Sequence, residues 1–327
     1  MKLKKIKIKR MVAVGTAILM TLSLAGCGIG SDSVKLGAAG VGGGYYAFSN
    51  AFAQIASSEN EDLDFEVKAT AGSTANIRLL SDGYVDMAIA QADLVDAAYN
   101  GTGATDKKRY RGYSAVASLY TEACQIVVRS DSGIDSLDDL QGKKISVGEE
   151  ESGTQRNAEQ ILKMTGLVES LVDTVNLDYV DAANELKSGQ IDAFFCTAGI
   201  QTSVIEELSK ECDVKLIGID DKCRDRLKSV YGFYTDYSIP AGTYEGQTQD
   251  VVTLGVRAVL LARDDMDEKI VEELTGLLFE HAQDIQYSIA LTFQIDESEA
   301  VKNVTIPFHD GAKAYYQKKG IEIPDEQ

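Results

Sequence analysis

The chain has 327 residues and a formal net charge of −19, which becomes −25 when the six cations of residues 1–10 are set aside. Such an acidic surface repels nucleic acids and anionic membranes, because binding to either depends on Lys and Arg side chains. We therefore expect no nucleic-acid partner. A metal site is not expected either, since only two histidines and no Cys-x-x-Cys pair are present.

The N-terminus predicts export. Residues 1–10 are basic, and an apolar run then ends in Leu-Ala-Gly-Cys at 24–27. This order is typical of a secretory signal peptide, and the apolar part is shorter than the roughly 20 residues that span a bilayer. The ending resembles a bacterial lipobox. We expect a lipoprotein signal peptide (1–26), lipidation of Cys27 and a tether (27–33), with an ordinary signal peptide or an uncleaved anchor as alternatives.

From residue 34 onward, short β-branched runs alternate with helical segments, which indicates an α/β fold. In chain order we expect a strand at 34–38, a helix at 46–57, a strand at 65–69, a helix at 74–80 and a strand at 87–90. Further elements follow at 125–128, 144–147, 156–163, 175–179, 182–186, 193–195 and 251–261, then helices at 269–282, 297–302 and 311–319.

One pattern occurs twice. Residues 80–90 and 186–196 each combine a helix end, a glycine turn, an aspartate and a buried strand. Two copies predict two similar α/β lobes, whose strand ends face each other across a cleft. The apolar segments 125–129 and 256–261 would be crossing strands that form a hinge. The predicted boundaries are 34–128 plus 245–327 for lobe I and 129–244 for lobe II.

Three loops join a strand to a helix and carry small or polar residues: 40–46 (Gly-Val-Gly-Gly-Gly-Tyr-Tyr), 71–76 (Ala-Gly-Ser-Thr-Ala-Asn) and 151–154 (Glu-Ser-Gly-Thr). Helix N-termini offer free N–H groups to an anion such as a carboxylate. Simpler interpretations stay open: Gly42 to Gly44 as a tight turn, Ser73 or Thr74 as an N-cap, and Asp93 as the cap of the next helix.

Known catalytic and nucleotide-binding motifs are missing. The first loop does not match Gly-x-Gly-x-x-Gly, and neither a P-loop nor Gly-x-Ser-x-Gly occurs. We therefore expect a binding protein rather than an enzyme. For the cysteines the sequence leaves two states open, a Cys212–Cys223 disulfide or free thiols.

Taken in order, these segments resemble the TAXI family of TRAP-associated extracytoplasmic solute receptors. The resemblance extends over about 34–323 and rests on residues 42–46, 69–80, 86–93, 127–148, 152–154, 189–195, 239–244 and 306–312. It implies a type II periplasmic-binding-protein fold that closes over a small organic acid or amino acid, such as glutamate, glutamine or a dicarboxylate. The ligand would pass to a TRAP membrane permease. We expect the receptor to be a monomer, because it must offer both lobe rims to its membrane partner. Its lipid would anchor it to the outer face of the cell membrane.

The resemblance and the loops together give the expected ligand-binding residues: Gly43, Gly44, Tyr45, Tyr46, Ser73, Asn76, Gln91, Asp93, Ser152, Gly153, Thr154, Thr197, Gly199 and, less firmly matched, Tyr244. The sequence departs from the family pattern at Val41 and Ala71, which puts the ligand's identity in doubt. The matched positions supply no arginine clamp. The alternative functions are a signalling receptor and a surface enzyme. A neighbouring permease gene would favour a transport receptor over a signalling receptor.

Overall fold

The computed structural model describes residues 33–103, 107–168, 170–289 and 295–324. The expected signal peptide, Cys27 and the tether up to residue 32 lie outside the described residues. None of the helices in the described ranges has both the length and the apolar character of a membrane span.

Ten strands form one mixed sheet in the order β2-β1-β3-β10-β4-β7-β5-β6, with β8 paired to β4 and β9 paired to β10. The strands are β1 (Val34–Gly37), β2 (Phe65–Lys68), β3 (Met87–Gln91), β4 (Tyr113–Arg129), β5 (Lys144–Ser146), β6 (Asp173–Val175), β7 (Ala193–Ala198), β8 (Val214–Leu216), β9 (Thr235–Ile239) and β10 (Val251–Arg263).

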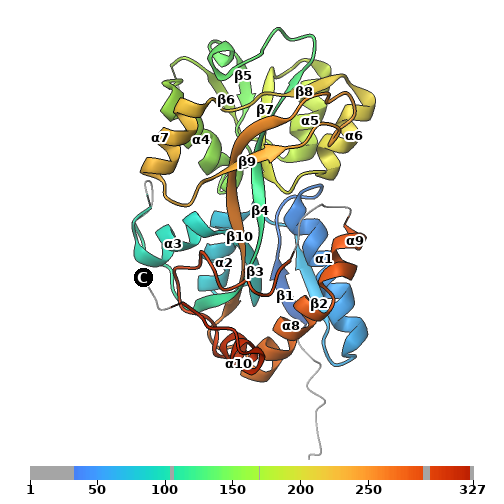
Figure 1. The fold of residues 1–327 in the computed structure, drawn as a ribbon, viewed down its shortest axis with the longest axis vertical. Helices are drawn as coiled ribbons and strands as arrows, with labels where there is room; N and C mark the ends of the chain where they lie inside the picture. Colours follow the sequence, from blue (N-terminus) through green and yellow to red (C-terminus); the bar gives the residue numbers. More distant parts are fainter. Residues whose placement is uncertain (1–32, 104–106, 169, 290–294, 325–327) are drawn as a thin grey trace, which may run out of the picture. The chain divides into compact units, whose positions relative to one another are not determined.

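Helices cover the sheet in both lobes (Figure 1). They are α1 (Gly44–Glu59), α2 (Ser73–Ser81), α3 (Ala92–Asn100), the 3₁₀ helix η1 (Leu137–Leu140), α4 (Gly153–Thr165), α5 (Tyr179–Ser188), α6 (Ser203–Glu211), α7 (Asp221–Val230), α8 (Glu268–Glu280), α9 (Ala282–Ser288) and α10 (Asp310–Lys319). The sequence indicated most of these elements. The expected helix at 297–302 is wrong, because this segment forms turns.

Two long strands connect the lobes. β4 and β10 pair antiparallel between Tyr113↔Arg263 and Ala123↔Gly255, and both run from one lobe into the other (Figure 1). In the first lobe β10 pairs with β3, and in the second lobe β4 pairs with β7. The predicted crossing strands are therefore confirmed, and they are longer than the sequence indicated.

Each lobe has its own hydrophobic core. Phe48 of α1 and Tyr316 of α10 belong to the core of the first lobe. Tyr316 also donates a hydrogen bond to the Val116 carbonyl of β4 (2.9 Å), so the C-terminal helices return to that lobe. Ile161 of α4 and Phe195 of β7 belong to a separate core in the second lobe.

The repeated sequence pattern corresponds to a repeated structure. Gly83 and Gly189 both follow a helix and both have φ = +75°, a conformation that glycine adopts without steric cost. The strands that follow, β3 and β7, are buried along their whole length. Each lies between a parallel neighbour (β1 or β5) and one of the antiparallel connecting strands.

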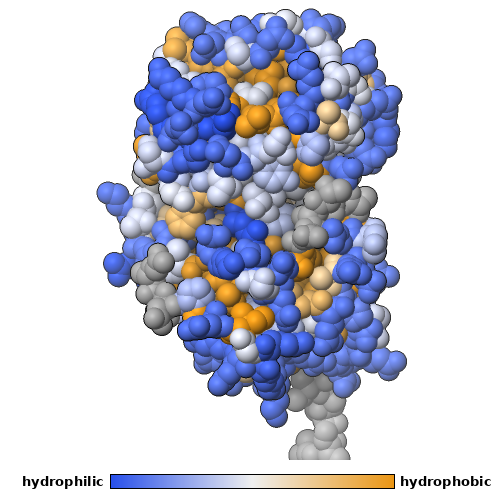
Figure 2. All heavy atoms as spheres, in the orientation of Figure 1, coloured by the Kyte–Doolittle hydropathy of each residue, from blue (hydrophilic) through white to orange (hydrophobic). Residues whose placement is uncertain are grey.

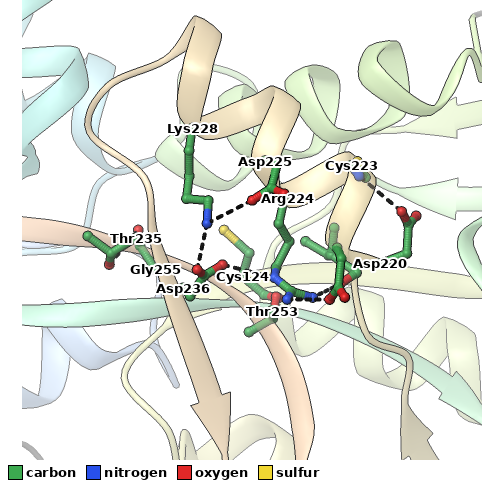
Figure 3. Close-up of polar contacts among 12 residues, drawn as sticks. Cys124, Asp220, Cys223, Arg224, Asp225, Lys228, Thr235, Asp236, Thr253 and Gly255 are labelled. Carbon is green, nitrogen blue, oxygen red and sulfur yellow. Dashed lines mark hydrogen bonds and ion pairs between the residues drawn. The ribbon is translucent and has the colours of Figure 1, made fainter.

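Outside its cores the protein is polar. Hydrophilic side chains cover most of the face shown in Figure 2. In the second lobe, α7 is attached to β9 because Arg224 and Lys228 both bind Asp236, at 2.9 and 2.5 Å (Figure 3). The thiols of Cys212 and Cys223 are free, so the structure has the free-thiol state and no disulfide at this pair.

Candidate functional site

A small cavity lies between the two lobes, where the loops before α1, α2 and α4 meet. Its volume is about 40 Å³, well below the roughly 150 Å³ of a protein cavity that holds benzene. An organic acid or amino acid therefore fits only if the lobes separate. The lining residues are Ala39, Gly40, Gly43, Gly44, Tyr45, Ala71, Gly72, Ser73, Gln91, Glu122, Glu149, Ser152, Gly153, Thr154, Leu177, Asp178, Tyr179 and Thr197.

The first-lobe wall of the cavity contains a buried carboxyl group, that of Glu122 in β4. Glu122 is 2% exposed, and its Oε2 accepts a hydrogen bond from the Tyr45 hydroxyl (2.7 Å). Burial raises the pKa of Glu122 to about 8, although the Tyr45 bond acts in the opposite direction. The described residues that line the cavity include no cation to pair with it, so this carboxyl group holds its proton at neutral pH.

Gln91 ends β3 beside Glu122. Its backbone N–H donates to Ser73 Oγ (3.1 Å), and its Nε2 donates to Asn157 Oδ1 in the second lobe (3.0 Å). Its Oε1 is buried and has no hydrogen-bond partner among the described residues. A buried acceptor without a donor costs about 1–3 kcal/mol, so this atom is suited to receive a donor from a bound molecule.

The second-lobe wall is made of hydroxyl groups that satisfy one another. The Tyr179 hydroxyl donates to the Thr197 carbonyl (3.1 Å) and lies 2.6 Å from Thr154 Oγ1. Thr154 Oγ1 also accepts from the Thr197 N–H (3.2 Å). These three residues of the wall are therefore bonded to one another, and burial raises the pKa of Tyr179 well above its usual value.

The helix N-termini at the cavity are used in different ways. At α4, Ser152 Oγ caps the helix by accepting from Gln155 N–H (2.9 Å). The N–H groups of Gly153 and Thr154 are in the first turn, which a helix leaves without partners of its own, and no acceptor among the described residues takes them. Gly44 and Tyr45 stand in the same positions at α1.

The N-terminus of α2 is occupied by the other lobe. The N–H groups of Thr74 and Ala75 donate to the Glu151 carbonyl, at 3.1 and 3.2 Å. The helix is capped by Gly72, with φ = +118° and no side-chain bond, so the simpler interpretation of Ser73 or Thr74 as the N-cap is wrong. Arg78 of the same helix pairs with the Glu151 carboxylate (2.7 Å).

Glycines at the cavity permit the lobes to approach closely. A Cβ at Gly153 would lie 2.5 Å from Gln91 Cδ, and one at Gly43 would lie 3.1 Å from a Tyr179 ring carbon. The sequence suggested that glycine lets a ligand approach the backbone. In this structure the groups that approach are side chains of the opposite lobe.

Nine of the expected residues line the cavity: Gly43, Gly44, Tyr45, Ser73, Gln91, Ser152, Gly153, Thr154 and Thr197. Five do not. Tyr46 follows Tyr45 in α1 and is not among the lining residues. The Gly199 carbonyl, just after β7, accepts a hydrogen bond from Thr202 Oγ1. The Tyr244 hydroxyl donates to Gln125 Oε1 of β4.

Asn76 and Asp93 are the other two. Asn76 is fully buried and donates to the carbonyls of Ala38 and Ile89, so its amide ties β1 to β3. Asp93 lines a separate groove of about 640 Å³ that also contains Arg156. Burial raises the pKa of Asp93 to about 6, and its Oδ1 has no partner among the described residues.

Four chemically important residues were missed: Glu122, Glu149, Asp178 and Tyr179. Glu122 had a signal in the sequence, because it is the one acid in the apolar run 115–128, and a buried strand seldom carries an unpaired acid. Burial and the nearby Asp178 raise the pKa of Glu149. Among the described residues that line the cavity there are three carboxyl groups and no Lys, Arg or His.

Two lobes joined by long paired strands, with a cavity between them, define the class of type II periplasmic solute-binding proteins. The chain belongs to the NMT1-like family, whose model matches residues 36–320.

Two solved structures are similar to this chain. MatC from Rhodopseudomonas palustris, determined with bound malate, is 14% identical, with a TM-score of 0.57 over 82% of this chain and 91% of that one. A protein from Bordetella bronchiseptica RB50 is 18% identical, with a TM-score of 0.53 over 90% and 83%. At these identities the similarity shows the fold.

Proposed function

We propose that this protein is an extracytoplasmic receptor that binds a small organic acid or amino acid between its lobes and delivers it to a membrane permease. The observation that carries the proposal is the cavity, which both lobes line with strand–loop–helix turns. A carboxylate of the ligand would be bound by the N–H groups at the starts of α1 and α4, because helix N-termini favour anions. Entry requires hinge motion along β4 and β10.

The permease would be of the TRAP type and the receptor of the TAXI type, as the motifs at 42–46, 69–80 and 86–93 suggest. MatC, with its bound malate, supports a small organic acid as one ligand class. We further propose lobe bounds of 34–128 plus 245–327 and 129–244, a monomeric state, and no catalytic turnover.

The test is a thermal-shift screen of the purified full chain against amino acids and small organic acids, after unfolding and refolding to remove carried-over ligand. A ligand at a hundredfold excess over its Kd should stabilise the fold by about 2.7 kcal/mol. Gly153→Ala should weaken that ligand about tenfold or more, because its methyl group meets Gln91. Gly232→Ala is the control, since nothing lies within 4 Å of its Cβ.

Two results would count against the proposal. A panel without any shift would refute binding of small acids and amino acids. A shift of equal size in Gly153→Ala would place the ligand outside the cavity. If a ligand binds but its uptake does not depend on a permease, the signalling receptor becomes the better description.

Membrane attachment is tested separately. We propose that Cys27 is acylated and is the first residue of the mature protein. Cys27→Ser should move the protein from the membrane fraction to the soluble fraction and remove the lipid mass from its N-terminal peptide. Unchanged membrane attachment together with an unmodified Cys27 in the parent chain would favour an uncleaved anchor.

A further inference from the structure

Carboxyl groups around the cavity are not balanced by basic side chains of the described residues. Glu122, Glu149 and Asp178 line it, and the described lining residues include no cation. The carboxyl group of Glu122 is the most deeply placed, with 2% exposure. A ligand carboxylate brought beside it would keep its proton in place, whereas an ammonium group would favour its ionised form and pair with it in a poorly solvated space.

An independent observation concerns Gln91, which is also 2% exposed. Its Oε1 is a buried acceptor without a donor among the described residues. The Gln91 amide lies against Gly153 of the other lobe. Together, Gln91 Oε1 and Glu122 present acceptors on one wall, and an N–H donor with positive charge complements both.

We propose that the ligand carries an ammonium or guanidinium group that binds Glu122 and Gln91 Oε1, and that it carries no more than one carboxylate. This inference rests on the proposed function and narrows it. Neutral amino acids and cationic amines would be bound, whereas glutamate and dicarboxylates would be disfavoured. The single carboxylate, where present, would be at the α1 and α4 N-termini, away from Glu122.

Binding of such a cation requires Glu122 to ionise, so it should release a proton. The titratable groups that interact electrostatically with Glu122 are Tyr45 of α1, Asp93 of α3, Tyr120 and Cys124 of β4, Tyr179 of α5 and Cys196 of β7. Burial raises the pKa of each tyrosine and cysteine, and Asp93 titrates near 6. Between pH 7 and 9, Glu122 is therefore the one member of this set that changes charge.

The experiment compares matched probes by isothermal titration calorimetry on the refolded full chain. L-Glutamine is paired with L-glutamate, and putrescine with succinate, so that each pair differs mainly in charge. Within each pair, we expect the amine without a second carboxylate to bind with about tenfold or more higher affinity. Its affinity should rise up to about tenfold per pH unit from pH 6.5 and level off above pH 8.

Variants assign the effect to Glu122. Glu122→Gln should weaken the preferred amine about tenfold or more and abolish the pH dependence, whereas Glu122→Asp, which keeps the charge, should retain the preference. Glu61→Gln, an exposed acid outside the cavity, is the control. Tight binding of glutamate or succinate that Glu122→Gln does not weaken would overturn this inference and leave the proposed function standing. Failure of every amino acid and organic acid to bind would refute the proposed function itself.

Discussion

The two walls of the cavity differ in how their polar groups are satisfied. On the first-lobe wall, Glu122 carries a carboxyl group with a raised pKa and Gln91 has an acceptor without a donor. On the second-lobe wall, Thr154, Tyr179 and Thr197 bond to one another. The first-lobe wall therefore offers groups that a ligand can still bind, whereas these three second-lobe residues are already bonded to one another.

The helices at the lobe contact show the same contrast. α4 is capped by Ser152 of its own lobe, so its cap does not depend on the other lobe. α2 is capped by Gly72, and its free N–H groups are satisfied by the Glu151 carbonyl of the other lobe. Lobe closure and the α2 terminus are therefore linked, and a ligand carboxylate at α2 would have to replace Glu151.

The largest effect is expected from Glu122→Gln. The pKa of Glu122 is about 8 in the fold against a usual 4.5, so the folded protein holds this proton more tightly than the unfolded chain does. Its stabilising contribution is complete below about pH 4.5 and is lost as pH rises through 8, which amounts to at most about 5 kcal/mol. Urea unfolding should show that the variant loses less stability between pH 5 and pH 9 than the parent chain does. Equal losses in both proteins would mean that Glu122 is solvated.

Gly72→Ala comes next, with an expected loss of about 1–3 kcal/mol in the free energy of unfolding. The reason is the backbone at Gly72, whose φ = +118° and ψ = −145° are open to glycine and hardly to other residues. Urea unfolding measures it, with Gly232→Ala as the control. A loss no larger than that of the control would show that the α2 cap relaxes without cost.

Tyr179→Phe should cost about 1 kcal/mol, because it removes one hydroxyl from the bonded set on the second-lobe wall. The group stays neutral near pH 7, so the pH dependence of stability should match that of the parent chain. Thermal unfolding across pH 5–9 checks both points. A changed pH profile would contradict the assignment of the titrating group to the first-lobe wall.

The smallest effect is expected from Glu151→Gln. Its ion pair with Arg78 is more than a third exposed on both sides, so the pair contributes about 0.5 kcal/mol or less and weakens with salt. The carbonyl bonds to Thr74 and Ala75 come from the backbone and persist in the variant. Urea unfolding at low and high salt should therefore differ little. A loss above about 1 kcal/mol would show that the side-chain pair itself holds the lobes together.

Local features of the sequence predicted much of this arrangement. The repeat at 80–90 and 186–196 identified β3 and β7, since a glycine turn followed by an apolar run is specific to a helix end and a buried strand. The loop glycines placed Gly43 and Gly153 at the cavity, and Ser73 and Gln91 came with them. Each of these signals depends on residues close together along the chain.

The errors have a common origin in side-chain direction. Asn76 is in the first turns of α2, close to the cavity along the chain, but the helix turns its amide toward β1 and β3. Asp93 begins α3 two residues after Gln91 and faces the groove with Arg156 instead. A sequence motif indicates where along the chain a residue lies, whereas the direction of its side chain depends on how its helix packs.

The α/β alternation, the two similar halves and the loops that meet at the cavity follow from local patterns along the chain, because periodicity and glycine turns depend on neighbouring residues. The folded chain brings Glu122 and Tyr179 to the cavity, places the Glu151 carbonyl at the N-terminus of α2, and sets Gly153 against Gln91 of the other lobe. These contacts join residues up to 77 positions apart, as in the Tyr45–Glu122 bond. Their energies come from burial and close approach, which no short stretch of sequence contains.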